Sequence, residues 1–277
     1  VVASYATMPY MSQYKKGKMF DPKSEAAFRI SRTKIDMFAK CPLCFYLDQH
    51  LGVKRPDTYP LTLNLAVDAL LKKEFDIHRA KQEAHPMMKQ YGLEAVPFQH
   101  EKMNIWRELD FGRGGIHYLQ SETNFDVYGV VDDVWINPQQ ELIIVDYKAT
   151  AKASAPTLDG DLGAQYKRQM EVYQWLFSKN NFKVSPIGYF VYVNGRKDVA
   201  VFDGKLEFVV SILPCEGDPR WIPNTLDEIK RVLISPTPPT ASPDCDYCAY
   251  RQVANEALNL KPKNVCLPHV GQFALFS

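Results

Sequence analysis

Residues 129–148 read GVVDDVWINPQQELIIVDYK, and this stretch decides the expected fold. β-branched and aromatic residues dominate both of its ends, whereas Asn137-Pro138-Gln139-Gln140 has the composition of a turn. We therefore expect strands over residues 127–136 and 142–148, paired as an antiparallel hairpin. Side chains alternate along a strand, so Asp146 and Lys148 should share one face while Tyr147 points to the other.

The expected hairpin brings acids from both strands together. Facing positions of paired strands lie within about 5 Å of each other, which lets Asp132 and Asp146 share a divalent cation. Mg²⁺ or Mn²⁺ held there would polarise a scissile phosphate and activate water, with Lys148 orienting that water or stabilising the developing charge. An isolated Asp-x-Lys is more often a cross-strand ion pair on a solvated face. Here it follows the apolar run 142–145, which indicates a buried strand where uncompensated charge is costly.

The rest of the chain alternates between helical and extended patterns, which predicts an α/β fold. Ser31 is a suitable N-cap for a helix that runs towards Gly52. Further helices are expected over about 61–80, 165–177 and 226–233, and further strands over 116–120, 187–193 and 206–213.

Three motifs in this order resemble the RecB-like branch of the PD-(D/E)XK nucleases. They are Gly129-x-x-Asp132, the segment Val145-Asp-Tyr-Lys-Ala-Thr150, and Gln169-x-x-x-Tyr173. The family includes nuclease domains of bacterial recombination exonucleases and CRISPR-associated adaptation nucleases. The resemblance extends, with gaps, from about Ser31 to Cys248. It implies a restriction-endonuclease-like core, in which helices flank a central mixed β-sheet.

The resemblance also implies roles for individual residues. Asp132 and Asp146 would bind the metal ion, Lys148 would be catalytic, and Gln169 and Tyr173 would contact DNA from the following helix. Residues four apart lie on one face of a helix, which is compatible with the last role. The alternative for Tyr173 is packing between helix and sheet. Asp133 faces the opposite side of its strand and would replace Asp132 only if the register were shifted.

The upstream helix departs from the family pattern. RecB-like members usually carry a histidine metal ligand in this helix, and Asp68 stands at the equivalent position. An aspartate suits Mg²⁺ or Mn²⁺ at least as well as imidazole does, but Asp68 is equally compatible with an ordinary exposed helix position. Glu74 is a secondary candidate ligand, and His78 is expected at the surface.

Four cysteines form two Cys-x-x-Cys pairs, at Cys41 and Cys44 and at Cys245 and Cys248. Four thiolates are what a tetrahedral zinc ion or a 4Fe-4S cluster needs. The pattern resembles iron-sulfur members of the superfamily, in which the cluster joins the N- and C-terminal segments. Those members typically have one early and three late cysteines, so zinc remains the alternative, as do four buried cysteines without metal. Neither of the other two cysteines, Cys215 and Cys266, is assigned a role.

These patterns predict an N-terminal arm over 1–28, a nuclease domain over 29–255 and a C-terminal tail over 256–277. The apolar runs are too short to span a membrane and the start does not resemble a secretory signal, so we expect a cytoplasmic protein. The net charge of +1 neither favours nor excludes a nucleic-acid partner.

We expect a divalent-metal-dependent DNA nuclease that acts on single strands or DNA ends. The first alternative is a DNA-binding protein of the same fold with weak or no catalysis, and the second is a zinc-stapled protein-interaction module. The chain lacks a Gly-x-x-x-x-Gly-Lys-Ser/Thr phosphate loop, so any motor would come from a helicase or another repair or CRISPR partner.

Overall fold

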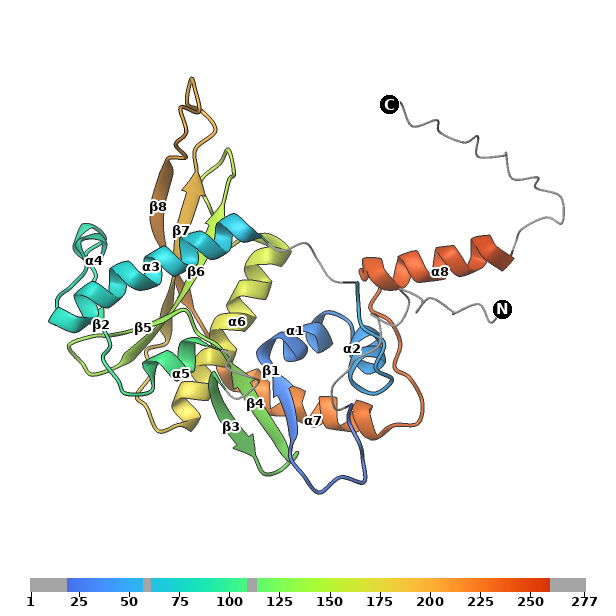
Figure 1. Cartoon of the computed structure of the whole chain (residues 1–277). Coiled ribbons are helices and arrows are strands. Elements are labelled where there is room, and N and C mark those ends of the chain that lie inside the picture. Colours follow the sequence, from blue (N-terminus) through green and yellow to red (C-terminus); the bar gives the residue numbers. More distant parts are fainter. Residues whose placement is uncertain (1–18, 57–60, 109–113, 260–277) are drawn as a thin grey trace, which may run out of the picture.

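The computed structural model describes residues 19–56, 61–108 and 114–259, which form two sheets surrounded by helices (Figure 1). The larger sheet has the strand order β2-β5-β6-β7-β8, and the smaller one has the order β1-β4-β3. The strands are β1 Phe28–Ser31, β2 Val96–Pro97, β3 Ile116–Gln120, β4 Phe125–Gly129, β5 Asp133–Ile136, β6 Leu142–Thr150, β7 Ile187–Gly195 and β8 Phe208–Glu216. The α-helices are α1 Arg32–Lys40, α2 Pro42–Gln49, α3 Thr62–Lys81, α4 Pro86–Gln90, α5 Met103–Arg107, α6 Gly160–Lys179, α7 Ile222–Ile234 and α8 Asp246–Asn259.

The hairpin of β5 and β6 forms as expected from the sequence. Asp133 lies opposite Val145, and Ile136 lies opposite Leu142 in an antiparallel register. β6 then pairs in parallel with β7, whereas the other strand pairs of this sheet are antiparallel. The prediction of an α/β fold with a central mixed sheet flanked by helices is thereby confirmed.

Helices cover both faces of the larger sheet. On one face, α3 buries Leu71 and Phe75 in a cluster with Trp135 and Tyr147. On the other face, α6 lies between the larger and the smaller sheet and contributes buried side chains to the main core. Each face of β6 is therefore enclosed by one helix, which explains the continuous apolar run before Asp146.

The prediction of a single strand over residues 127–136 is wrong. The chain leaves the small sheet after β4 and enters the large sheet at β5. Between these strands, the backbone nitrogen of Val131 donates to the carbonyl of Trp106 at 3.1 Å, and the Val131 side chain is fully buried. Gly129 and Asp132, which flank the point where the chain changes sheets, are residue types depleted in strands.

The helix expected from Ser31 towards Gly52 is interrupted. Ser31 caps α1 as predicted, since its hydroxyl accepts from the backbone nitrogen of Lys34 at 3.3 Å. Cys41, however, is extended, with φ −159° and ψ 102°, and α2 starts directly after it at Pro42. Proline fits the first turn of a helix but cannot continue an existing one, which explains the break.

The N-terminal end of the described chain is packed against the core, whereas α8 is largely exposed and Cys248 is the buried residue within it. The buried Phe20 donates its backbone nitrogen to the carbonyl of Gln49 at 2.8 Å. α8 continues to Asn259. The remaining parts of the expected arm and tail, residues 1–18 and 260–277, lie outside the described residues. Within the described ranges, no helix is long and apolar enough to cross a membrane.

Candidate active site and cysteine cluster

Asp146 and Lys148 lie on the face of β6 that is covered by α6. The side chain of Asp146 is 2% exposed, and its Oδ2 pairs with the ammonium group of Lys148. Lys148 Nζ also lies 4.6 Å from the centre of the Tyr166 ring. Burial acts to lower the pKa of Lys148, but the charges of Asp146 and Asp132 outweigh it and raise that pKa. Lys148 is therefore a protonated group beside a buried carboxylate.

Asp132 lies immediately before β5 and faces the same site. Its Oδ2 accepts from the backbone nitrogen of Tyr147 at 2.8 Å, which fixes the carboxylate beside β6. Burial, followed by repulsion from Asp146, raises the pKa of Asp132 to about 6. Two acids that repel each other in a partly enclosed site favour a cation between them.

α3 adds a third acid and a second lysine. Lys72 Nζ lies 2.8 Å from Asp68 Oδ2 and 3.5 Å from Asp132 Oδ1, so it bridges the helix and the hairpin. Burial and the charge of Asp132 raise the pKa of Asp68. Sequence reasoning missed Lys72, although its position four residues after Asp68 places the two side chains on one helix face.

The three carboxylates offer oxygen ligands of the kind that Mg²⁺ and Mn²⁺ prefer. The three carboxylates carry three negative charges, and Lys72 and Lys148 beside them carry two positive charges. Among the described residues, these carboxylates do not form a group whose ligand atoms all lie within 4.8 Å of one another. The donor chemistry therefore fits a divalent cation, and the ammonium group of Lys72 pairs with both Asp68 and Asp132 at the place that such a cation would take.

Gln169 and Tyr173 approach the acids from α6. Gln169 Nε2 donates to Asp146 Oδ1 at 2.5 Å, and Gln169 Oε1 accepts from Lys148 at 3.3 Å. Tyr173 packs closely against Gly129, where an added Cβ would lie 2.6 Å from the tyrosine ring. Both α6 side chains are buried. Their predicted contact with DNA stays a prediction, while their contacts with the motif residues are present here.

The other acidic candidates lie apart from this cluster. Asp133 is fully buried on the opposite face, where it pairs with Arg79 and accepts from the Tyr147 hydroxyl at 2.7 Å. This arrangement agrees with the alternation expected for the strand, in which Asp133 replaces Asp132 only after a register shift. Glu74 pairs with His85 at 2.9 Å.

The two Cys-x-x-Cys pairs form one buried cluster. The Sγ atoms of Cys41 and Cys248 are 3.7 Å apart, and Cys44 Sγ lies 3.6 Å from Cys245 and 3.5 Å from Cys248. All four sulfur atoms lie within 4.8 Å of one another, and none forms a disulfide. The cluster joins the start of α2 to the start of α8, as the sequence predicted for the terminal segments, and its donor set can bind a metal ion.

The environment of the cysteines differs from that of Cys215. Burial acts to raise the pKa of Cys41, but hydrogen bonds from the backbone at Ser242 and Cys44 outweigh it and lower the pKa to about 6. For Cys215, burial raises the pKa to about 11. Burial, followed by contacts with other cysteines of the cluster, raises the pKa of Cys248, and burial also raises the pKa of Cys44. The cluster therefore combines thiols whose pKa values shift in opposite directions, whereas Cys215 behaves as a core residue. Cys266 lies outside the described residues.

Comparison with known proteins agrees with this arrangement. The model of the PD-(D/E)XK nuclease superfamily matches residues 29–253. The chain belongs to this superfamily. The triplet Asp146-Tyr147-Lys148 has the form (D/E)XK, and Asp132 as the preceding acid of the motif stays a prediction. PD-(D/E)XK nucleases typically use divalent metals, which agrees with the donor set described above.

A solved structure described as "Crystal structure of SSO0001" is 16% identical to this PD-(D/E)XK chain, with a TM-score of 0.37. The alignment covers 84% of this chain and 87% of that one. Comparison with curated proteins finds no match.

Proposed function

We propose that this protein is a divalent-metal-dependent deoxyribonuclease of the RecB-like branch, which hydrolyses phosphodiester bonds in single-stranded DNA or at DNA ends. The observation that carries the proposal is the meeting of Asp132 and Asp146 with Lys148 on one face of the β5–β6 hairpin. Asp146 is almost completely buried. A surface ion pair, which the protein-interaction alternative requires, would be solvated instead.

Asp132 and Asp146, with Asp68 as a third ligand, are the residues that would hold Mg²⁺ or Mn²⁺. When bound, such an ion polarises the scissile phosphate and makes water a stronger nucleophile. Lys148 is held in its charged form by the neighbouring acids and can donate hydrogen bonds to phosphate oxygens as negative charge develops. Gln169 contacts both Asp146 and Lys148, so it positions the two groups relative to each other.

The direct test uses DNA labelled at its 5′ or 3′ end, as single strands and duplexes, with Mg²⁺, Mn²⁺ or EDTA. We expect metal-dependent cleavage by the wild-type protein and its loss in Asp146→Asn and Lys148→Ala. Lys73→Ala is the matched control, because Lys73 is exposed on α3. Cleavage that survives in both site variants would refute the assignment, and the label pattern would give the polarity.

One observation favours the alternative of a DNA-binding protein with weak catalysis. Lys72 lies between Asp68 and Asp132, and its charge opposes a metal ion at the same place. This alternative predicts that folded wild-type protein binds DNA but leaves every labelled substrate intact with either metal. Binding and cleavage assays on the same preparation separate the two proposals.

For the cysteine cluster we propose a single zinc ion in preference to a 4Fe-4S cluster. A tetrahedral ion with Zn–S bonds of about 2.3 Å places its thiolates about 3.8 Å apart. Three of the six sulfur separations, at 3.5–3.7 Å, are close to this value, and all six are within 4.8 Å. A cubane places an iron atom behind each thiolate and requires a wider ring of cysteines. The ion would join the two terminal segments of the nuclease domain.

DNA is the proposed partner, and a cytoplasmic setting is the proposed location. Since the sequence contains no phosphate loop of the Gly-x-x-x-x-Gly-Lys-Ser/Thr type, unwinding of a duplex would depend on a helicase or another repair or CRISPR protein. DNA unwinding by the isolated chain in the presence of ATP would contradict this proposal.

A further inference from the structure

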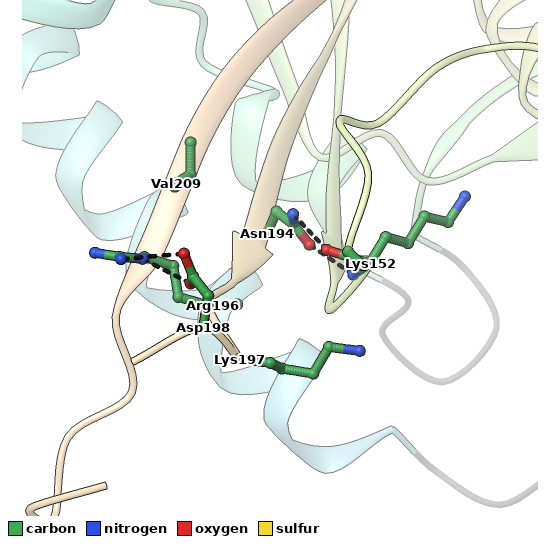
Figure 2. A pocket seen from close by; sticks show the side chains of 8 residues that line it. Lys152, Asn194, Arg196, Lys197, Asp198 and Val209 are labelled. Carbon is green, nitrogen blue, oxygen red and sulfur yellow. Dashed lines mark hydrogen bonds and ion pairs between the residues drawn. The ribbon is translucent and has the colours of Figure 1, made fainter. Parts of the chain in front are cut away.

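A pocket of about 360 Å³ lies at the end of the large sheet, beyond the acidic site. Figure 2 shows it between the segment that follows β6 and the loop end of the β7–β8 hairpin. Basic side chains predominate over the single acid in its lining, which consists of Lys152, Ala153, Asn194, Gly195, Arg196, Lys197, Asp198 and Val209.

Side chain to backbone hydrogen bonds hold one wall of this pocket in place. Asn194 Oδ1 accepts from the backbone nitrogen of Lys152 at 2.8 Å, and Asn194 Nδ2 donates to the Lys152 carbonyl at 3.0 Å. On the hairpin, Arg196 pairs with Asp198 at 3.0 Å and with Glu207 at 2.9 Å. The charge of Arg196 is thus matched by two acids.

In the described part of the chain, two lysines of the pocket, unlike Arg196, have no acid paired with them. Over the described ranges, neither Lys152 nor Lys197 forms an ion pair. In Figure 2 their side chains extend in the same direction from the two sides of the pocket. The pocket therefore presents two cations together to an anionic ligand.

The pocket continues the face of the sheet that carries the acidic site. Thr150 shares a face of β6 with Asp146 and Lys148, and it lies beside Asn194 in the parallel pairing of β6 and β7. Lys152 lies two residues past the end of β6, so at about 3.3 Å per extended residue it is at most roughly 13 Å from Lys148 along the chain. A nucleic-acid strand covers this distance with about two to four nucleotides.

We propose that this pocket binds the phosphate backbone of single-stranded DNA a few nucleotides from the scissile bond, through Lys152 and Lys197. The inference rests on the proposed function and adds a second contact region to the same substrate. Ammonium groups bind phosphates as mobile point charges and read no sequence. Binding to the pocket should therefore depend on the length of the DNA strand and not on the identity of its bases.

The test measures fluorescence anisotropy of labelled oligo-dT of 12 nucleotides in the cleavage-deficient Asp146→Asn background with Mg²⁺. We expect Lys152→Ala/Lys197→Ala to weaken binding about tenfold at low salt and to reduce the slope of log affinity against log salt by about 1.4. The control is Lys81→Ala/Lys89→Ala. Both control lysines are exposed, and Lys81 ends α3, whose 20 residues extend about 30 Å from its start near Ala149.

Two outcomes distinguish this inference from the proposed function. If the pocket variant and the control bind equally while the wild-type protein cleaves DNA, the pocket assignment is overturned and the nuclease proposal stands. If binding depends on Lys152 and Lys197 but the wild-type protein does not cleave, the pocket assignment stands and the DNA-binding alternative replaces the nuclease. A wild-type chain that neither binds nor cleaves DNA overturns both.

Discussion

Gln169 donates a hydrogen bond of 2.5 Å to Asp146, the acid at the centre of the candidate site. The same amide group also accepts from Lys148, so one side chain on α6 contacts both functional groups of β6. A carboxylate that is held by its strand neighbour and by a helix retains its orientation without substrate. Such preorganisation reduces the reorganisation needed during catalysis.

Replacement of Gln169 by leucine removes both contacts while nearly preserving the volume of the side chain. We expect Mn²⁺ affinity or the single-turnover cleavage rate to fall about 10- to 100-fold, as is typical when a hydrogen bond to a metal ligand is lost. Calorimetric Mn²⁺ titration and single-turnover assays measure the two effects. Gln165→Leu is a control on the same helix. Unchanged values in Gln169→Leu would show that this amide does not position the site.

Lys72 should limit the affinity of the site for metal. Lys72→Met removes a positive charge from between Asp68 and Asp132. Two unit charges about 4 Å apart interact by about 4 kcal/mol at an effective dielectric constant of 20, so relief of part of this repulsion is enough for a tenfold effect. We expect Mn²⁺ to bind at least about tenfold more tightly in calorimetry, with Lys73→Met unchanged. Weaker binding would instead mean that Lys72 holds the two acids in a binding arrangement.

Arg79 should matter for stability, because it pairs with the fully buried Asp133 on the face opposite the site. Removal of one partner of a buried pair leaves an uncompensated charge. We expect Arg79→Met to lower the free energy of unfolding by about 3–5 kcal/mol in urea denaturation. The double variant Arg79→Met/Asp133→Leu should recover part of the loss, since neither charge remains buried alone. A double variant less stable than the single one would argue against this explanation.

The sequence was sufficient to predict the hairpin, its faces and the acids beside Lys148. Alternation along β6 separates Asp146 and Lys148 from Tyr147, and the turn at residues 137–140 sets the pairing of β5 with β6. These features depend on local patterns. The paired cysteines were predictable for the same reason, because their spacing within each pair is a local signal.

The remaining features depend on contacts between distant segments. At the break between β4 and β5, Val131 forms a backbone bond with Trp106, which lies about 25 residues earlier in the chain and outside the hairpin. Lys72 gains its place in the site only because α3 packs across β6. The lining of the pocket beside Asn194 likewise comes from segments that follow different strands.

The metal at the cysteine cluster gives the last prediction. We expect elemental analysis of the purified protein to find one zinc per chain and no iron, and the visible spectrum to lack iron-sulfur absorption. Four sulfur atoms within 4.8 Å of one another, three of whose separations are 3.5–3.7 Å, suit one tetrahedral ion. Four irons per chain with visible absorption would contradict this and require the cysteines to move apart.

Cys248→Ser should lose the ion and lower the melting temperature, because the cluster joins the start of α2 to the start of α8. Cys215→Ala is the matched control: it also removes a buried thiol, but one outside the cluster, so zinc should remain at one per chain. A strong chelator should destabilise the wild-type protein and Cys215→Ala and have little effect on Cys248→Ser. If the chelator destabilises all three equally, the stabilising ion lies at the acidic site rather than at the cysteines, since the acids are intact in every variant.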